Sequence, residues 1–406
     1  KVTIRHGDRS AINIIPNARQ SYWACQPYSP EVSRVWEGTS RYQVENVDGI
    51  PLERELMPLV LTEDQIGDSN FNFKENAGNM CANGQLTETG IRQHLTLGAS
   101  MRKAYMDLLG GQLERDQVYV RSTDYPRTLQ SAAAFLMAFL PDADRLTMVT
   151  DEDESREVMH GVGLRSSSKG ESGEKEVEGM CQRAVDLSQQ ETSRFRVRSD
   201  VSNKLVDLFG EGVLAMKITE VADPVHSLSC HNMTLPCSDG GKGCMSPTLA
   251  LSVLSEGNRD MCMRYMGAAG GMESGALAIY PFTSEILGNM KDALMGMSPV
   301  KFFLYSGHDT VIAPVLASLG AFNCEWPPYA SHVAFELWAP KGGGGVVDLE
   351  GDRGDNDEGE GGEDVRRGGG GGTPSSPEAA AVHGPTSSIP SHSSPSSSGS
   401  ASVNPP

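Results

Sequence analysis

The sequence predicts an α/β fold: a mixed, largely parallel sheet flanked by helices, in a Rossmann-like three-layer core. Short runs of apolar and β-branched residues, typical of strands, occur near both ends of residues 1–340, and helix-like segments lie between them. Strands that alternate with helices favour a parallel sheet, because two parallel strands need a long crossover connection, which a helix supplies.

Four segments have the composition of strands. The first, KVTI, has three β-branched residues in a row and is shorter than an average strand, so we expect the chain to begin partway through it. The other three contain more large apolar residues. The predicted strands comprise residues 1–4, 117–120, 300–306 and 332–339.

Two helices are expected in the first 150 residues. Residues 86–109 offer Thr87 as an N-cap, and Ile91 and Leu95 then begin an apolar face. Residues 127–140 follow a strand and a turn. Their apolar part is half the length of the ~20 residues that span a bilayer, which indicates a buried helix.

Composition divides the chain into four parts. Residues 1–150 and 286–340 carry the expected strands and form the two halves of the α/β core. Residues 151–285 are more polar and mostly helix-like, which predicts an inserted, mainly helical cap domain. Residues 341–406 consist mainly of Gly, Ser, Pro and acidic residues, with too little apolar surface to offset the entropy of ordering, so we expect a disordered tail.

The charge balance excludes nucleic acid as the main partner. The formal net charge is −19, whereas binding to a nucleic-acid backbone needs a basic face. An acidic protein can still bind a small phosphorylated molecule through a local cluster of cations. No apolar run approaches membrane-spanning length, so we expect no membrane segment within this sequence.

The eight cysteines favour an oxidising compartment over a metal site. None forms a C-x-x-C pair, which argues against structural zinc, and an even number fits disulfides. Cys237 and Cys244 flank a Gly-rich turn that a disulfide could close, and Asn232 begins an N-glycosylation sequon. We therefore expect the secretory pathway; the alternative is an unused sequon beside free thiols.

Charged and polar residues follow three of the expected strands. The segments are residues 5–9 (RHGDR), 121–124 (RSTD) with Arg127 shortly beyond, and 306–309 (SGHD). Ligands of open α/β sheets bind beyond the carboxyl ends of the strands. Each segment alone is compatible with a solvated surface, but three of them at one sheet edge predict a common ligand site.

These segments resemble, in order, the motifs of the histidine acid phosphatase family. The resemblance rests on RHGDR at 5–9, VRSTDYPRTLQSA at 120–132, SGHDTVIAPVLASLG at 306–320 and FELW at 335–338, and it covers nearly all of residues 1–340. Within the family, HNMTLPCSDGGKGC at 231–244 is most similar to the 2-phosphoxylose phosphatase branch.

The resemblance implies hydrolysis of a phosphate monoester through a phosphohistidine. His6 matches the nucleophile, and Asp309 matches the acid that protonates the leaving alkoxide and then activates water. Arginine suits phosphoryl oxygens because its planar fork donates paired hydrogen bonds and stays charged. No metal or other cofactor is implied. The residues that match the clamp on the phosphoryl oxygens are Arg5, Arg9, Arg121 and His308.

We therefore expect a metal-independent acid phosphomonoesterase with an acidic pH optimum, because Asp309 must be protonated when the ester bond breaks. The branch implies a phosphorylated sugar, such as 2-phosphoxylose of a proteoglycan linkage region. The alternative is a broad-specificity acid phosphatase or phytase-like enzyme. A non-catalytic phosphate-binding module is disfavoured, since all the site positions are present. Ser10 and Ala11 stand where many family members have proline, which leaves the substrate preference open.

Other residues of the motifs are assigned supporting roles. Asp8 and Asp124 are expected to orient the clamp arginines rather than to act directly. Gly7 would let the backbone pass close to the substrate. His94, in the helix at 86–109, is expected to be packed rather than catalytic.

Overall fold

The computed structural model describes residues 1–19, 41–54, 81–143, 145–151, 157–159, 195–267 and 272–338, with single residues at positions 23, 29, 32, 56, 183, 184, 186, 187 and 190. These residues form a seven-stranded sheet with the strand order β3-β2-β5-β4-β6-β1-β7. The five inner strands run parallel, and the edge strands β3 and β7 are antiparallel to their neighbours. The predicted mixed, largely parallel sheet is confirmed. The strands are β1 (Val2–Arg5), β2 (Tyr42–Asn46), β3 (Pro51–Leu52), β4 (Val118–Ser122), β5 (Leu146–Thr150), β6 (Phe302–Gly307) and β7 (His332–Ala334).

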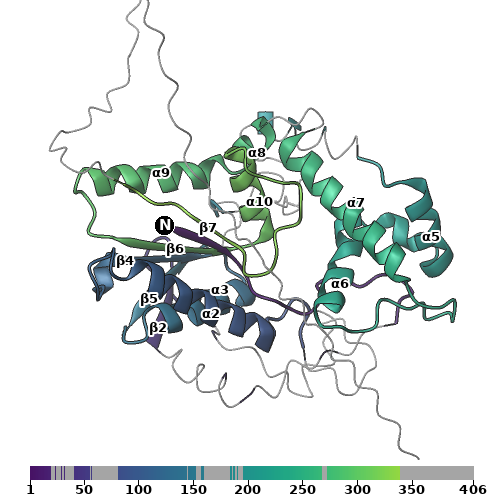
Figure 1. The fold of residues 1–406 in the computed structure, drawn as a ribbon, viewed down its shortest axis with the longest axis horizontal. Helices are drawn as coiled ribbons and strands as arrows, with labels where there is room; N and C mark the ends of the chain where they lie inside the picture. The colour runs from purple at the N-terminus through teal and green to yellow at the C-terminus, as the bar shows by residue number, and fades with distance from the viewer. Residues whose placement is uncertain are drawn as a thin grey trace, which may run out of the picture. The chain divides into compact units, whose positions relative to one another are not determined.

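Helices cover both faces of the sheet (Figure 1). Side chains alternate along β6, so that Phe302 and Leu304 pack on one face, whereas Phe303 and Tyr305 pack on the other. Because both faces are covered, every residue of β6 is buried. This is the expected three-layer core. One layer contains α2 (Glu88–Tyr105) and α3 (Pro126–Phe139), and the other contains α9 (Tyr280–Leu294) and α10 (Asp309–Ser318).

Three further helices lie beside the sheet (Figure 1). They pack through an apolar cluster of their own, which includes Leu205, Val225 and Val253. They fall within residues 151–285, for which an inserted cap is predicted, and the predicted boundary at 285 lies inside α9. The helices are α5 (Ser199–Phe209), α6 (Ile218–Cys230) and α7 (Pro247–Met266), followed by the short α8 (Glu273–Ala278), which contacts α7 and α10.

The structure adds strands that the sequence pattern does not predict and shortens one that it does. β2, β3 and β5 are additional. The predicted strand at 332–339 is reduced to β7, which pairs with β1. The Phe335 N–H still donates to the Lys1 carbonyl oxygen at 2.7 Å, so the pairing ends where β1 begins. Thr87 caps α2 as predicted, because its side chain accepts from the Gly90 N–H.

Disulfides link Cys237 to Cys244 and Cys262 to Cys324. The first is the bridge that the sequence suggests. Among the helices of the described residues, none is both long and apolar enough to cross a membrane. The predicted disordered tail, residues 341–406, lies outside the described residues.

Candidate active site

The carboxyl ends of β1, β4 and β6 lie side by side at one edge of the sheet. β6 lies between β4 and β1, and Arg5 at the end of β1 is in register with Gly307 at the end of β6. The His6 N–H donates to the Gly307 carbonyl oxygen at 2.9 Å, and the Thr123 N–H donates to the Ser306 carbonyl oxygen at 3.1 Å. The three segments that the sequence singles out therefore meet at this edge, as expected.

His6 is buried at this edge, and its ring is held in one orientation. Its Nδ1 lies 2.9 Å from the carbonyl oxygen of Gly7. A carbonyl oxygen only accepts, so Nδ1 carries the proton and Nε2 keeps its lone pair. Burial, followed by the charges of Arg5, Arg127 and Arg9, holds the pKa of His6 well below its usual range. The imidazole is therefore neutral, the form in which it is a nucleophile.

Arg5 and Asp309 form a buried ion pair. Arg5 Nη2 lies 2.7 Å from Asp309 Oδ2, and Arg5 also donates to the carbonyl oxygen of Pro327. Trp326 Nε1 donates to the same Asp309 oxygen at 2.6 Å. Burial raises the pKa of Asp309, but Arg5, the Trp326 hydrogen bond and Arg9 together lower it by more. Asp309 is therefore a carboxylate in this state.

Arg9 is held by a residue that no sequence motif reveals. Its Nη2 lies 2.8 Å from Asp223 Oδ1, and both side chains are buried. The other Asp223 oxygen accepts from the N–H groups of Ile12 at 2.7 Å and Asn13 at 2.9 Å. Asp223 belongs to α6, 211 residues from Ile12 along the chain. Asp223 reaches Arg9 because α6 packs against the loop that follows β1.

His308 lies beside His6, with 5.5 Å between the ring centroids. Its Nε2 is 2.9 Å from Thr123 Oγ1, which in turn is 3.0 Å from Thr128 Oγ1. The Thr128 hydroxyl donates to the carbonyl oxygens of Thr123 and Tyr125, which only accept. Thr123 must therefore donate to Thr128, and His308 Nε2 must donate to Thr123. The two hydroxyls fix the orientation of the His308 ring.

Of the two arginines in residues 121–127, Arg127 is the one near His6. It follows Pro126 in the first turn of α3, its Nε is buried, and its guanidinium lies 4.6 Å from the ring centroid of Tyr125. Within the described part of the chain it forms no ion pair. Burial, and then Arg9, lower the pKa of Arg127 to about 10. Arg127 is not predicted from the sequence as a clamp residue, although its position just beyond a strand end is the signal for it.

Arg121 does not join this group, which corrects the expectation that it belongs to the clamp. Its Nη1 lies 3.0 Å from Glu285 Oε2 of α9, and its Nη2 lies 3.5 Å from Glu157 Oε1. Arg121 is in register with Tyr305, whose side chain packs on the face that α9 covers. Glu285 and Glu157 therefore hold Arg121 on that face, away from His6.

Asp8 and Asp124 do not orient the clamp arginines, contrary to expectation. One oxygen of Asp8 accepts from Thr87 Oγ1 and from His231 Nε2, each at 2.5 Å. Asp124 accepts two hydrogen bonds from Arg54, both at 2.8 Å. The carboxylates that do hold the arginines come from other elements of the fold.

Gly7 is required for packing against α2. A Cβ on Gly7 would lie 2.5 Å from the carbonyl oxygen of Gly90, and a Cβ on Gly90 would lie 2.3 Å from the carbonyl oxygen of Asp8. The two glycines let the loop that carries His6 cross the first turn of α2 at close range. His94, on the same helix, is fully buried, as expected.

Two aromatic residues in the segment after α10 enclose the group. The Tyr329 ring centroid lies 4.3 Å from the Arg5 guanidinium carbon and 5.8 Å from the His6 ring centroid. Its hydroxyl is 3.1 Å from Ser227 Oγ on α6. Trp326 contacts Asp309, as described above. Neither residue is predicted from the sequence, because the segment has no periodic pattern and carries no motif.

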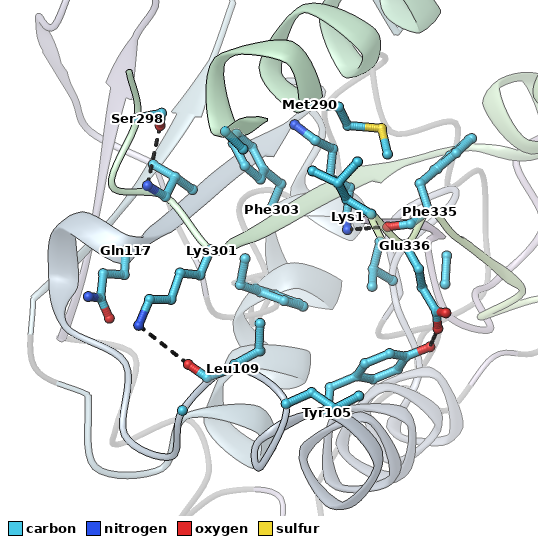
Figure 2. A pocket seen from close by; sticks show the side chains of 18 of the residues that line it. Lys1, Tyr105, Leu109, Gln117, Met290, Ser298, Lys301, Phe303, Phe335 and Glu336 are labelled. Carbon is cyan, nitrogen blue, oxygen red and sulfur yellow. Dashed lines mark hydrogen bonds between the residues drawn. The ribbon is translucent and has the colours of Figure 1, made fainter. Parts of the chain in front are cut away.

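A cavity of about 860 Å³ lies at the opposite edge of the sheet and contains none of these residues. Figure 2 shows Lys1 and Phe303 in its lining, with Lys301 donating to the Leu109 carbonyl oxygen. Val2 and Phe302, which line it, are the first residues of β1 and β6, at the opposite ends of these strands from the His6 group. The cavity is therefore separate from the His6 group.

The buried pair of Glu157 and Arg121 makes stability depend on pH. Burial raises the pKa of Glu157 from 4.5 to about 7, with Arg121 and the Met159 N–H acting in the opposite direction. The folded state then binds a proton more tightly than the unfolded chain, so this contribution is full below pH 4.5 and is lost as the pH rises to about 7. The loss amounts to about 3 kcal/mol.

We expect Glu157→Gln, which cannot ionise, to gain about 3 kcal/mol relative to the parent protein between pH 4.5 and pH 8. Urea unfolding of both proteins at these two pH values measures the difference, in which the titration of other groups cancels. Glu273→Gln, at an exposed position, is the control. The prediction would be contradicted if the free energy of unfolding of Glu157→Gln differed from that of the parent protein by the same amount at pH 4.5 and at pH 8.

Comparison with known proteins identifies the family. The model of the histidine phosphatase superfamily, branch 2, matches residues 1–205 and 270–363. Human 2-phosphoxylose phosphatase 1 is 28% identical over 352 residues, which cover 83% of this chain and 66% of that protein. Mouse prostatic acid phosphatase is 31% identical over 269 residues, which cover 64% of this chain and 68% of that protein.

The chain thus spans about two thirds of the length of the curated relatives it matches. Counting factor 60 of Dictyostelium discoideum is 28% identical over 271 residues, covering 64% of this chain and 60% of that protein. The family match includes the segments at all three strand ends described above. The chain belongs to the histidine phosphatase superfamily, branch 2.

Proposed function

We propose that this protein is a phosphomonoesterase that needs no metal ion and works through a phosphohistidine on His6. One observation carries the proposal: a neutral, buried imidazole with its Nε2 lone pair available, next to three arginines, namely Arg5, Arg9 and Arg127. A phosphate monoester is a dianion, so a nucleophile reaches its phosphorus only where positive charge offsets that of the ester.

In the proposed reaction, His6 Nε2 attacks phosphorus, and the bond from phosphorus to the ester oxygen breaks. Asp309 gives a proton to the departing alkoxide. A water molecule then attacks the phosphohistidine while Asp309 accepts its proton, and the bond between nitrogen and phosphorus breaks. Orthophosphate leaves, His6 is again neutral, and Asp309 is again protonated. Arg5, Arg9 and Arg127 bind the phosphoryl oxygens. His308 binds them through Nδ1 in its protonated form, because its Nε2 donates to Thr123.

Asp309 must gain its proton before the first step. The arginines hold its pKa below the usual range in the free protein. A bound dianion would offset the charges of Arg5 and Arg9, so the pKa of Asp309 rises when substrate binds. Low pH favours the protonated carboxyl, which supports the expectation of an acidic optimum.

We infer that the substrate is a phosphorylated sugar, such as 2-phosphoxylose of a proteoglycan linkage region. The similarity to 2-phosphoxylose phosphatase 1, which extends over 83% of this chain, supports this choice. The similarity to prostatic acid phosphatase supports the alternative, a broad-specificity or phytase-like acid phosphatase. A non-catalytic binding module is the least favoured, because His6 and Asp309 are both present.

We also propose that an α/β core carries an inserted helical cap and that the protein belongs to the secretory pathway. The separate apolar cluster of α5, α6 and α7 supports a cap. The disulfides Cys237–Cys244 and Cys262–Cys324 and the exposed Asn232 of the sequon support an oxidising, secretory compartment.

The function is tested by hydrolysis of p-nitrophenyl phosphate at pH 5 with EDTA present. We expect turnover that the chelator does not reduce. Arg127→Lys keeps the charge but loses the paired donors, so kcat/KM should fall about tenfold or more. Arg121→Lys is the matched control and should change kcat/KM less than about threefold.

Two outcomes would contradict this assignment. A folded protein that binds orthophosphate but shows no turnover between pH 4 and pH 8 would favour the binding module. A larger loss in Arg121→Lys than in Arg127→Lys would return the clamp role to Arg121.

A further inference from the structure

Asp8 lies between two residues of the proposed reaction and makes buried contacts with two helices. In the chain it separates His6 and Gly7 from Arg9, and its side chain is 1% exposed. Its Oδ2 accepts from Thr87 Oγ1, the N-cap of α2, and from His231 Nε2, which follows α6, each at 2.5 Å. A carboxylate oxygen accepts, so His231 Nε2 carries a proton and donates it to Asp8.

His231 is held in place by the way α6 ends. The Met233 N–H donates to the Leu228 carbonyl oxygen at 2.9 Å, and the Asn232 N–H donates to the Ser229 carbonyl oxygen at 3.1 Å. Asn232 has a φ of 51°, so the chain leaves the helix through a Schellman motif. The motif uses backbone groups only, so the His231 side chain is not needed to end the helix.

The same helix contacts the loop after β1 at a second point. Asp223, eight residues before His231, binds the Arg9 side chain and the N–H groups of Ile12 and Asn13. Eight residues of helix span about 12 Å. Asp223 thus anchors the far side of the loop and Arg9 itself, while His231 anchors Asp8, the part of the loop that lies nearer to His6.

The loop has little freedom on its other side. The Asp8 N–H donates to Gln93 Oε1 at 2.8 Å, and Gly7 packs directly on Gly90. The Asp8 carboxylate therefore sits between two rigid elements, α2 and the end of α6. Its contact with His231 is the one that ties the loop to the helices beside the sheet at this point.

We propose that His231 is a positioning residue: by donating to Asp8, it holds the loop so that His6 Nε2 is aligned with the phosphorus atom. The proposal rests on the proposed phosphatase function. The His231 side chain is 23% exposed, and the ring of Trp23 lies edge-on to the imidazole, with 5.1 Å between the ring centroids. Among the described residues, the hydrogen bond of its side chain goes to Asp8, so the effect of His231 on His6 passes through Asp8.

Alignment and phosphate binding depend on different residues, which sets the expected kinetics. Arg5 is paired with Asp309, and Arg9 keeps its separate anchor, Asp223. Loss of the His231 contact should therefore leave substrate binding nearly intact and make productive attack rarer. The signature is a lower kcat with little change in KM.

The experiment compares His231→Ala with His231→Gln, whose amide can place an N–H donor where Nε2 lies. With p-nitrophenyl phosphate at pH 5, we expect His231→Ala to lower kcat about tenfold and to change KM less than about twofold. His231→Gln should recover most of the lost kcat. In the Asp8→Ala background, where His231 has no acceptor at this position, His231→Ala should lower kcat by much less than tenfold, because the two residues act through one contact.

His332→Ala, at an exposed position on β7, is the control for loss of a histidine. Unchanged kcat in His231→Ala would overturn the proposal, and so would equal losses in His231→Ala and His231→Gln. A thermal midpoint that falls while kcat of the folded fraction is unchanged would show a structural role only, and would also overturn it. An inactive wild-type protein would instead refute the proposed function itself.

Discussion

Replacing His6 by alanine is expected to lower kcat for every phosphate monoester by at least about 10⁴-fold, because the reaction loses its nucleophile. The neutral imidazole, with Nδ1 bound to the Gly7 carbonyl oxygen, has one nitrogen for attack. Alanine offers none, and water held among the arginines attacks a phosphate dianion poorly. Substrate binding should persist, since the arginines remain.

The measurement is hydrolysis of p-nitrophenyl phosphate at pH 5 with EDTA, wild type beside His6→Ala. With a substrate labelled in its phosphoryl group, rapid quenching without acid should trap a labelled phosphoenzyme in the wild type only. The label should be released by acid. His332→Ala, at an exposed position, should keep both activity and labelling. Activity above about one per cent of the wild-type value in His6→Ala would refute a phosphohistidine on His6. So would labelling of the His6→Ala protein.

Replacing Asp309 by asparagine is expected to lower kcat by about 10² to 10⁴-fold with alkyl phosphates, whose alkoxides leave only when they are protonated. With an aryl phosphate, whose phenolate is a good leaving group, the loss in the first step should be much smaller. Asparagine keeps the shape and can still accept from Trp326, but it also removes the charge that pairs with Arg5. The comparison of the two substrates therefore isolates the proton.

Pre-steady-state kinetics with an aryl and an alkyl phosphate separate the two steps. In Asp309→Asn, we expect a burst of phenol followed by slow turnover, because the water that attacks the phosphohistidine also lacks its base. Asp124→Asn, a carboxylate that binds Arg54, is the control and should retain nearly full kcat. An equal loss with both substrates and no burst would show that Asp309 acts only by holding Arg5.

The layers of the fold follow from patterns that the sequence displays locally. The apolar segment at 300–306 becomes β6, buried on both faces, and Thr87 caps the helix that it is predicted to cap. Weaker patterns are not recognised. β5 (Leu146–Thr150) alternates buried and half-buried residues over five positions, too short a run to separate from a helix or a loop.

Some residues of the candidate site can likewise be recognised from the sequence, and others cannot. The segments that carry His6, His308 and Asp309 are found from the sequence because they follow strands whose ends meet at one sheet edge. The resemblance to the family then selects these three residues. The choice between Arg121 and Arg127 cannot be made like this. Both are near the end of β4, and the register with β6 and the carboxylates of Glu157 and Glu285 decide which one turns toward α9.

The strand ends and the polar residues that follow them can be read from the sequence, because strand propensity and short motifs depend on neighbours along the chain, and the resemblance to the family implies their chemistry. The pairing of each carboxylate with its cation depends on the tertiary structure. Asp223 reaches Arg9, and His231 reaches Asp8, across separations of more than two hundred residues. Such pairs depend on how α6 packs against the loop after β1, and no local pattern encodes that packing.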